Sequence, residues 1–140
     1  NNNILYLHQL NDKLQGYAIP FSAYGLWSWV KGYIAFEADG NTVKGFTVYS
    51  HQETPGLGGE CEKPWFQDQF IGKQILDEKG QFVSVGVVKG KVEDYINEDQ
   101  RINYVDGMSG ATITSKGIQD YLKQTLENYE PFSKKIRTGA

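Results

Sequence analysis

The chain has 140 residues, of which 39% are hydrophobic, 14% aromatic and 22% charged, a balance typical of one folded domain and not of a disordered chain. Its 14 basic and 17 acidic residues give a net charge of −3, so it has no basic field to hold a nucleic acid. With one Cys and two His residues, it can build neither a disulfide framework nor a zinc site of Cys and His ligands.

The first half of the sequence predicts four β-strands. Short apolar and aromatic runs place them at residues 4–10, 16–21, 30–38 and 43–49, and the turn sequence Ala-Asp-Gly-Asn at 38–41 joins the last two as a hairpin. The last of these runs has no cleanly polar face, so we expect both faces of the sheet to be covered, with helices packed on it.

The second half of the sequence begins with a predicted helix and strand. The helix spans 62–70, has Pro64 in its first turn, where a missing N–H costs nothing, and is closed by Gly72. Residues 82–88 alternate between apolar and small or polar side chains as a strand does.

The clearest helix lies at 113–129, because its apolar and aromatic residues recur every three or four positions. This stripe consists of Ile118, Tyr121, Leu122, Thr125, Leu126 and Tyr129. We expect Thr114 or Ser115 to cap its N-terminus and Pro131 to end it. About five strands and two helices predict an α+β fold, an antiparallel or mixed sheet with packed helices.

A glycine-rich loop follows the fourth predicted strand, with the sequence Glu-Thr-Pro-Gly-Leu-Gly-Gly-Glu at 53–60. Its glycines and proline force tight turns and let backbone N–H groups approach a ligand closely. The loop is also compatible with an ordinary surface connection, since Pro-Gly is common in type II turns. Leu57 favours a ligand, because an apolar side chain among glycines needs a partner surface that a flat aromatic molecule would supply.

A run of small and hydroxyl-bearing residues at 106–115, Asp-Gly-Met-Ser-Gly-Ala-Thr-Ile-Thr-Ser, leads into the last helix. The first N–H groups of a helix have no intrahelical acceptor and its dipole favours negative charge, so such a run is a candidate phosphate site. The same residues can serve as helix caps and nothing more. The run lacks the G-x-S-x-G pattern of a serine nucleophile, and we assign no catalytic residue and no metal ligand.

These two segments carry a resemblance to a known family. The pattern Asp-x-x-Ser-Gly-Ala-Thr at 106–112 matches the flavinylation motif of domains that hold FMN through a phosphoester bond. Together with the 53–60 loop and Tyr-Gly-Leu-Trp at 24–27, it resembles the C subunit of the Na⁺-translocating NADH:quinone oxidoreductases of bacterial respiratory membranes, over residues 14–130. The G subunit of the Rnf electron-transport complex shares the loop and the motif, and it is the alternative within the same class.

The resemblance implies an FMN attached to the hydroxyl of Thr112. Four neighbours would line its phosphate and ribityl chain: Ser109, Gly110, Ala111 and Thr114. Six more would surround the flavin ring, with Leu26, Trp27 and Leu57 against its face and Glu53, Thr54 and Gly56 at its edge. Leu26 and Trp27 are equally compatible with plain core packing. Asp106 would either contact the flavin or be read by the attaching enzyme.

As a member of that family, the chain would be one extracytoplasmic FMN-binding domain spanning 1–140, an electron carrier within a Na⁺-translocating NADH:quinone reductase. The cofactor would supply the chemistry, so no general acid or base is needed. The start at Asn1, without Met or an apolar segment, predicts a membrane anchor before it in the native chain.

The expected partners are other membrane subunits of the complex and a flavin transferase for maturation, with the domain on the periplasmic side of the cell inner membrane. The alternative from another class is a module that holds FMN or another phosphate ligand without a covalent bond.

Overall fold

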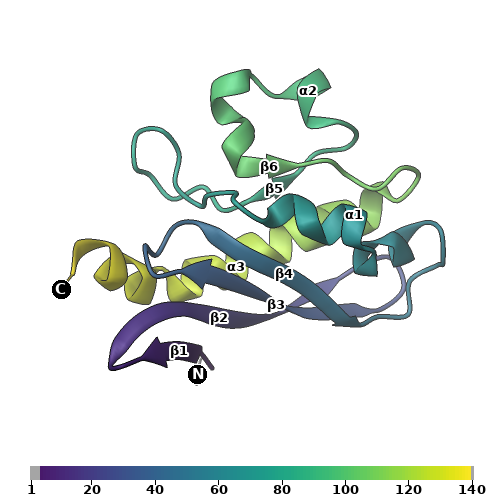
Figure 1. Ribbon diagram of the computed structural model, residues 1–140. Coiled ribbons are helices and arrows are strands. Elements are labelled where there is room, and N and C mark those ends of the chain that lie inside the picture. Colours follow the sequence, from purple (N-terminus) through teal and green to yellow (C-terminus); the bar gives the residue numbers. More distant parts are fainter. Residues whose placement is uncertain (1–3, 140) are drawn as a thin grey trace.

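A four-stranded antiparallel sheet and a long C-terminal helix form the body of the computed structural model, which describes residues 4–139 (Figure 1). The strands follow one another as a meander in the order β1-β2-β3-β4. Their bounds are Tyr6–Leu10, Lys13–Tyr24, Trp29–Glu37 and Val43–Ser50. The four strands predicted in the first half are confirmed, and so is the α+β class, although β2 is longer than predicted at both ends.

The hairpin between β3 and β4 turns where the sequence predicted it. The N–H of Glu37 donates to the carbonyl of Thr42 at 2.9 Å, and Gly40 has a φ of +69°, a conformation that favours glycine. The Asp39 carboxylate accepts the N–H groups of Asn41 and Thr42 at 2.9 and 2.8 Å. The turn is therefore closed by its own hydrogen bonds.

Among residues 4–139 only one face of the sheet is buried, so the prediction that both faces would be covered is wrong. The outer face carries Tyr6, Tyr33 and Tyr49, which are exposed and pack on one another. The ring centroids are 5.9 Å apart for Tyr6 and Tyr33 and 5.4 Å apart for Tyr33 and Tyr49. Cross-strand aromatic pairing thus fills this face in place of a helix.

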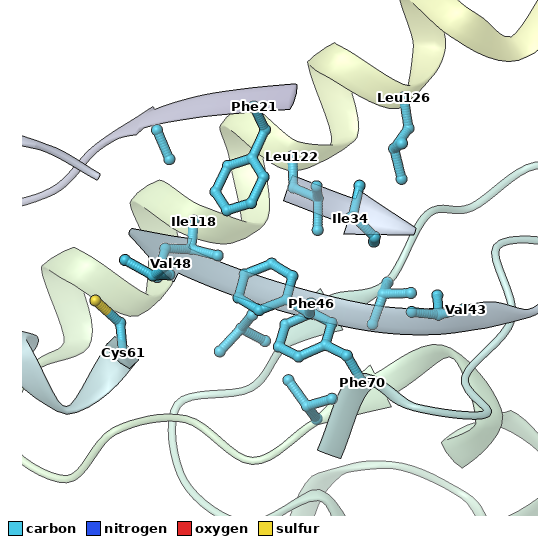
Figure 2. Packing of buried hydrophobic residues seen from close by; sticks show 14 of the residues in the cluster. Phe21, Ile34, Val43, Phe46, Val48, Cys61, Phe70, Ile118, Leu122 and Leu126 are labelled. Carbon is cyan, nitrogen blue, oxygen red and sulfur yellow. The ribbon is translucent and has the colours of Figure 1, made fainter. Parts of the chain in front are cut away.

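The core lies between the buried face of the sheet, α1 (Pro64–Gln67) and α3 (Thr112–Thr138), as Figure 2 shows from close by. Phe46 of β4 stacks on Phe70 with ring centroids 3.9 Å apart and on Phe21 at 5.0 Å. Four members of the predicted helical stripe are buried against the sheet: Ile118, Leu122, Leu126 and Tyr129. The stripe is therefore confirmed as the core-facing side of α3.

α3 begins one residue before the predicted start, with Ala111 as its N-cap. The prediction of Thr114 or Ser115 as the cap is wrong, because both lie inside the first turns and bond elsewhere. The Thr114 hydroxyl donates to Glu53, and Ser115 Oγ accepts the N–H of Met108 at 3.2 Å. In the described part of the chain, no side chain caps the start of α3.

Pro131 lies inside α3, so the prediction that it ends the helix is wrong. A proline within a helix lacks the N–H that would bond the carbonyl four residues before it. The helix continues because the turn after Pro131 is packed on the sheet. The hydroxyl of Tyr17 lies 2.7 Å from Ser133 Oγ, and its ring centroid lies 5.2 Å from that of Phe132. Tertiary packing therefore outweighs the local penalty.

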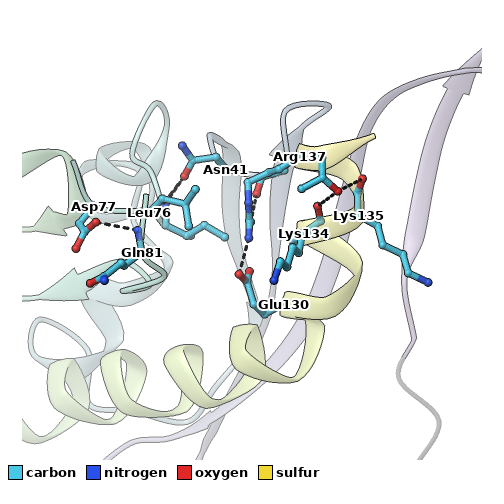
Figure 3. A network of polar contacts seen from close by, with 12 residues as sticks. Asn41, Leu76, Asp77, Gln81, Glu130, Lys134, Lys135 and Arg137 are labelled. Carbon is cyan, nitrogen blue, oxygen red and sulfur yellow. Dashed lines mark hydrogen bonds and ion pairs between the residues drawn. The ribbon is translucent and has the colours of Figure 1, made fainter. Parts of the chain in front are cut away.

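Polar contacts tie the end of α3 to the turn between β3 and β4 (Figure 3). Arg137 donates to the carbonyl of Gly40 at 2.8 Å and pairs with Glu130. From the turn itself, Asn41 Oδ1 accepts the N–H of Leu76 at 2.9 Å. The turn thus joins the sheet, the helix and the middle of the chain.

The middle of the chain consists of short helices and irregular backbone. Its elements are η1 Gly58–Glu62, α1 Pro64–Gln67, η2 Asp68–Phe70, β5 Gly86–Val87, α2 Val92–Tyr95, η3 Glu98–Asn103 and β6 Tyr104–Val105. The predicted helix at 62–70 is confirmed in place but splits into α1 and η2. The predicted strand at 82–88 is wrong over most of its length. Only β5 forms a strand there, in parallel with β6, while Phe82 makes an isolated bridge to Leu76 and Ser84 has a φ of +68°.

None of the helices in residues 4–139 combines the length and the apolar character needed to cross a bilayer.

Candidate functional site

A cavity of about 270 Å³ lies where three segments meet: the 25–28 loop between β2 and β3, the 53–58 loop after β4, and the start of α3. Its lining consists of Leu26, Trp27, Glu53, Thr54, Leu57, Gly58, Gly110, Ala111, Thr112, Ile113 and Thr114. The glycine-rich loop and the start of the last helix, both of which one FMN was expected to contact, therefore lie side by side.

Nine of the eleven residues predicted for the site line this cavity. The other two lie outside its lining: Ser109 is exposed in the turn before α3, and Gly56, with a φ of +81°, faces open space. The sequence did not predict two lining residues, Gly58 and Ile113. Ile113 carried a signal, because it is apolar yet falls outside the stripe that α3 buries.

The mouth of the cavity is apolar and open to solvent. Four large side chains form this apolar mouth, with exposed fractions of 46% for Leu26, 64% for Trp27, 44% for Leu57 and 59% for Ile113. The alternative that Leu26 and Trp27 are core residues is therefore wrong. Apolar side chains gathered around one opening form a surface that a flat apolar ligand would cover.

Two glycines allow the walls of the cavity to approach each other closely. A Cβ on Gly58 would lie 2.6 Å from Thr114 Oγ1, and a Cβ on Gly117 would lie 2.2 Å from the carbonyl oxygen of Tyr24. Real side chains do not make contacts this short. Glycine at these two positions therefore brings the first turns of α3 against the loops on either side.

Glu53 is the one ionisable side chain in the lining, and it is 4% exposed. Its carboxylate accepts the Thr114 hydroxyl at 2.7 Å and the backbone N–H groups of residues 26–28 at 2.8 to 3.0 Å. Burial alone would raise the pKa of the Glu53 carboxyl, but these hydrogen bonds outweigh it and lower the pKa below the usual 4.5. The cavity wall therefore contains a carboxylate that stays ionised at neutral pH.

α3 starts with a tight turn that brings Thr112 to the surface. The N–H of Ala111 donates to the carbonyl of Met108 at 3.0 Å, and Gly110 has a φ of +71° in this turn. Thr112 is exposed at the first position of a 27-residue helix. A negatively charged group is stabilised at such a position by the free N–H groups and the helix dipole.

Thr112 also lines a second, smaller cavity of about 210 Å³. Two exposed lysines, Lys89 and Lys116, line this second cavity with it, and Lys116 pairs with Asp120 at 2.8 Å. The Lys89 ammonium adds positive potential near the start of α3, which favours an anion there as the helix dipole does, whereas the Asp120 carboxylate offsets the charge of Lys116.

Asp106 lies outside the lining of the main cavity and holds the backbone that leads to it. Its N–H donates to Gln69 Oε1 at 2.9 Å, and its Oδ1 accepts the N–H of Val92, the first residue of α2, at 2.7 Å. The adjacent Gly107 passes so close to Val88 that a Cβ would lie 2.0 Å from the Val88 carbonyl oxygen. The structure thus gives Asp106 a positioning role, and its recognition by an attaching enzyme stays a prediction.

Two other reactive side chains near the cavity are held by the fold. His51 Nδ1 accepts the N–H of Glu53 at 3.0 Å, and its Nε2 lies 3.1 Å from Glu62 Oε1, which fits a histidine that closes the end of a strand. Burial raises the pKa of the Cys61 thiol to about 12, with a smaller contribution from Glu53 and Glu62. The thiol is therefore protonated and a poor nucleophile.

Similarity to known proteins identifies the family to which a chain with this site belongs. The chain matches the FMN-binding domain over residues 25–127, a span that includes all three segments of the cavity. It is 45% identical over 124 residues to the C subunit of the Na(+)-translocating NADH-quinone reductase of Yersinia pestis and 41% identical over 141 aligned positions to that of Vibrio alginolyticus. These matches cover 87% and 99% of this chain but 44% and 53% of the relatives, so the chain spans about half their length.

Solved structures agree with the sequence relatives. The crystal structure of the Na(+)-translocating NADH-quinone reductase C subunit from Parabacteroides distasonis has a TM-score of 0.80 at 38% identity, and the match covers 92% of this chain and 61% of that one. Shewanella oneidensis NqrC gives a TM-score of 0.79 at 35% identity, covering 97% and 61%. The chain therefore belongs to the FMN-binding domain family, and over most of its length it is similar to the C subunit of the Na(+)-translocating NADH-quinone reductases.

Proposed function

We propose that this chain is the FMN-carrying domain of the C subunit of a Na⁺-translocating NADH:quinone reductase and that it relays electrons within that complex. The observation that carries the proposal is the cavity, which joins Thr112 of the Asp-x-x-Ser-Gly-Ala-Thr motif to an apolar mouth of the kind that binds a flavin ring. The family match supports FMN as the cofactor, and the names of the relatives support the complex.

The residues of the cavity fit both ends of an FMN molecule. The apolar mouth offers contact area to an isoalloxazine ring, as aliphatic and aromatic side chains do in cofactor sites. At the start of α3, free N–H groups fit a phosphate. Between the two, Gly110 and Ala111 leave room for a ribityl chain, because neither side chain extends beyond Cβ.

We infer further that the FMN phosphate is esterified to the side-chain oxygen of Thr112. Three hydroxyl residues lie in the first turns of α3, and an ester requires a hydroxyl that is accessible. The Thr114 hydroxyl is buried and bonded to Glu53, and Ser115 is buried with its Oγ bonded to Met108. Thr112 is exposed, so its hydroxyl is open to a flavin nucleotide that a transferase holds and that carries its phosphate in a phosphoanhydride. The Thr112 oxygen would bond to the flavin-side phosphorus as the phosphoanhydride P–O bond breaks, with the other phosphate half leaving and the hydroxyl proton passing to the transferase or to solvent.

Bound FMN supplies the electron-transfer chemistry, and the residues of this chain bind and orient it. The apolar mouth excludes water from the flavin surface that it covers. Glu53 does not serve as a proton donor, because its carboxylate is ionised and already accepts bonds from Thr114 and the 26–28 backbone. The domain therefore needs no general acid or base of its own.

The chain spans about half the length of the curated relatives it matches, and the proposal extends to a protein of their full length. We propose that other subunits of the complex exchange electrons with the flavin and that a flavin transferase attaches it. We also propose that a membrane anchor outside residues 1–140 holds the domain on the periplasmic side of the inner membrane. A covalent bond suits that side, because a reversibly bound flavin would be lost where free FMN is not supplied.

Co-expression with a flavin transferase tests this function. We expect a yellow protein whose flavin fluorescence stays with the denatured chain, and a colourless protein when the transferase is left out. Flavin that leaves the chain on denaturation would favour the non-covalent module, and a chain that takes up no flavin under either condition would contradict the proposal. The Rnf alternative predicts the same flavin, and the neighbouring genes in the source genome would distinguish it.

A further inference from the structure

The carboxylate of Glu53 receives five hydrogen bonds from two other segments of the chain, which we call the Glu53 network. Oε1 accepts the N–H of Leu26 at 2.8 Å and the hydroxyl of Thr114 at 2.7 Å. Oε2 accepts the N–H groups of Trp27 and Ser28 at 3.0 and 2.9 Å and the Ser28 hydroxyl at 3.1 Å. One side chain thus joins the loop between β2 and β3 to the first turn of α3.

This arrangement requires an ionised carboxylate. All five partners donate, and a carboxylate offers about four lone-pair sites on two oxygens without a donor of its own. The four ion pairs in residues 4–139 all lie elsewhere, so hydrogen bonds in place of a Lys or Arg partner stabilise the Glu53 charge. A buried charge without hydrogen-bond partners is strongly unfavourable. The Glu53 carboxylate therefore holds the 25–28 loop and the start of α3 in the positions from which their N–H and hydroxyl groups donate to it.

The loop that donates to Glu53 also carries half of the apolar mouth. A Cβ on Gly25 would lie 2.3 Å from Glu53 Oε1, so the loop can approach the carboxylate only with glycine at this position. The N–H of Gly25 donates to the carbonyl of Ser28 at 2.9 Å and closes the loop as a turn. The positions of Leu26 and Trp27 at the apolar mouth therefore depend on the side chain of Glu53, which belongs to another segment.

We propose that Glu53 is the positioning residue of the flavin cavity, whose carboxylate holds Leu26 and Trp27 in place across the cavity from the start of α3 and puts a negative charge in the cavity wall at neutral pH. A fixed negative charge opposes the addition of electrons to a group beside it. Glu53 therefore both shapes the cavity and lowers the reduction potential of a flavin bound there. The second effect rests on the proposed function, whereas the Glu53 network is a property of the protein without its cofactor.

Amide hydrogen exchange of the flavin-free protein tests the network. Glu53→Gln replaces one accepting oxygen with an NH₂ donor, so at least one N–H among residues 26–28 loses its partner. We expect exchange of these amides to accelerate roughly tenfold or more. Glu60→Gln is the matched control, because it removes a charge from η1 outside the cavity lining and keeps the acceptor for the Trp65 indole. Wild-type exchange at all three amides in Glu53→Gln would overturn the proposal.

If Glu53→Gln does not fold, Ser28→Ala tests the Glu53 network in its place. This variant retains the carboxylate and deletes the hydroxyl that lies 3.1 Å from Oε2. Exchange of the Trp27 and Ser28 amides should rise by a factor of about five. The control is Ser22→Ala, at an exposed position of β2, which should leave these amides unchanged. Equal rates in the Ser28 variant and the wild type would contradict the network.

The flavin-loaded protein tests the electrostatic effect. The midpoint potential of the flavin should be higher in Glu53→Gln than in the wild type and unchanged in Glu60→Gln. An equal or lower potential in Glu53→Gln would overturn the proposed effect of Glu53 on the potential.

These experiments distinguish a failure of the Glu53 network from a failure of the proposed function. If the wild type takes up no flavin, the proposed function fails while amide exchange still decides the network. If the wild type is loaded and exchange is unaltered in Glu53→Gln, the network fails while the function stands.

Discussion

The hydroxyl of Thr114 donates a 2.7 Å hydrogen bond to Oε1 of Glu53, and the two residues are 61 positions apart in the chain. Both side chains are buried, with 2% and 4% of their surfaces exposed. The bond links the first turns of α3 to the loop after β4. These are the two segments whose motifs predicted the site, so their meeting is fixed by a specific polar contact as well as by packing.

Thr114→Val should destabilise the fold by about 1–3 kcal/mol, because it leaves a buried carboxylate oxygen with one donor fewer. Thr114→Ser keeps the hydroxyl and should lose less. Urea unfolding of the two variants beside the wild type measures the difference. Equal losses in both variants would show that the hydroxyl contributes nothing.

Glu53 should make the stability of the fold sensitive to acid. Despite burial, hydrogen bonds from Thr114 and the 26–28 backbone lower the pKa of its carboxyl below 4.5 in the folded state. A group with a depressed pKa contributes stability that is complete above its unfolded pKa and is lost as the pH falls through the folded pKa. The difference in unfolding free energy between the wild type and Glu53→Gln should therefore shrink as the pH falls from about 7 to about 3.

Urea unfolding at several pH values measures this difference. Asp39 also has a lowered pKa, because bonds from Thr42 and Asn41 outweigh its burial, but it is present in both proteins and cancels. A difference that stays constant over the whole range would contradict a role for the charge of Glu53.

Gly117→Ala should destabilise the protein although alanine favours helices by about 1 kcal/mol over glycine. Its Cβ would lie 2.2 Å from the carbonyl oxygen of Tyr24, so the start of α3 would have to move away from the loop that carries the apolar mouth. We expect a net loss of about 1–3 kcal/mol in chemical denaturation. Gly45→Ala is the control, because a Cβ there meets nothing within 4 Å. A Gly117 variant as stable as the wild type would mean that the close approach is not required.

Pro131→Ala should stabilise the protein. Pro131 is exposed inside α3, and a proline in a helix interior is up to about 3 kcal/mol less favourable than alanine. The turn after it is held by the contacts of Tyr17 with Phe132 and Ser133, which the substitution leaves in place. A higher melting temperature with an unchanged fold is the expected result, and a lower one would show that the proline shape is needed.

Much of the fold could be predicted because its signals are local. The stripe of α3 and the Asp39–Gly40 turn depend on residues close together in the chain, and both are confirmed. Three errors have long-range causes. Pro131 stays within α3 because Tyr17 packs on the turn that follows it. Thr114 does not cap the helix because its hydroxyl donates a hydrogen bond to Glu53. The outer face of the sheet stays open because its tyrosines pair with one another.

The candidate site likewise has one part that local sequence signals predicted and another part that depends on long-range contacts. The motifs predicted most of the residues that line the cavity, including Thr112 and Leu57. They could do so because the residue types in a motif indicate which kind of ligand the site binds. The role of Glu53 could not be predicted from the sequence. A glutamate beside a glycine-rich loop indicates a ligand contact, and only the fold shows that its oxygens accept bonds from residues 26–28 and Thr114.

Whether Thr112 carries the flavin is tested most directly by the intact masses of two variants, each co-expressed with the transferase. Thr112→Val keeps the shape of the side chain, removes the ester oxygen and should change stability by about 1 kcal/mol or less, since the residue is exposed. We predict that the wild type and Thr114→Val gain the mass of one esterified FMN and that Thr112→Val gains none. Flavin on the Thr112 variant, or its loss from the Thr114 variant alone, would contradict the assignment.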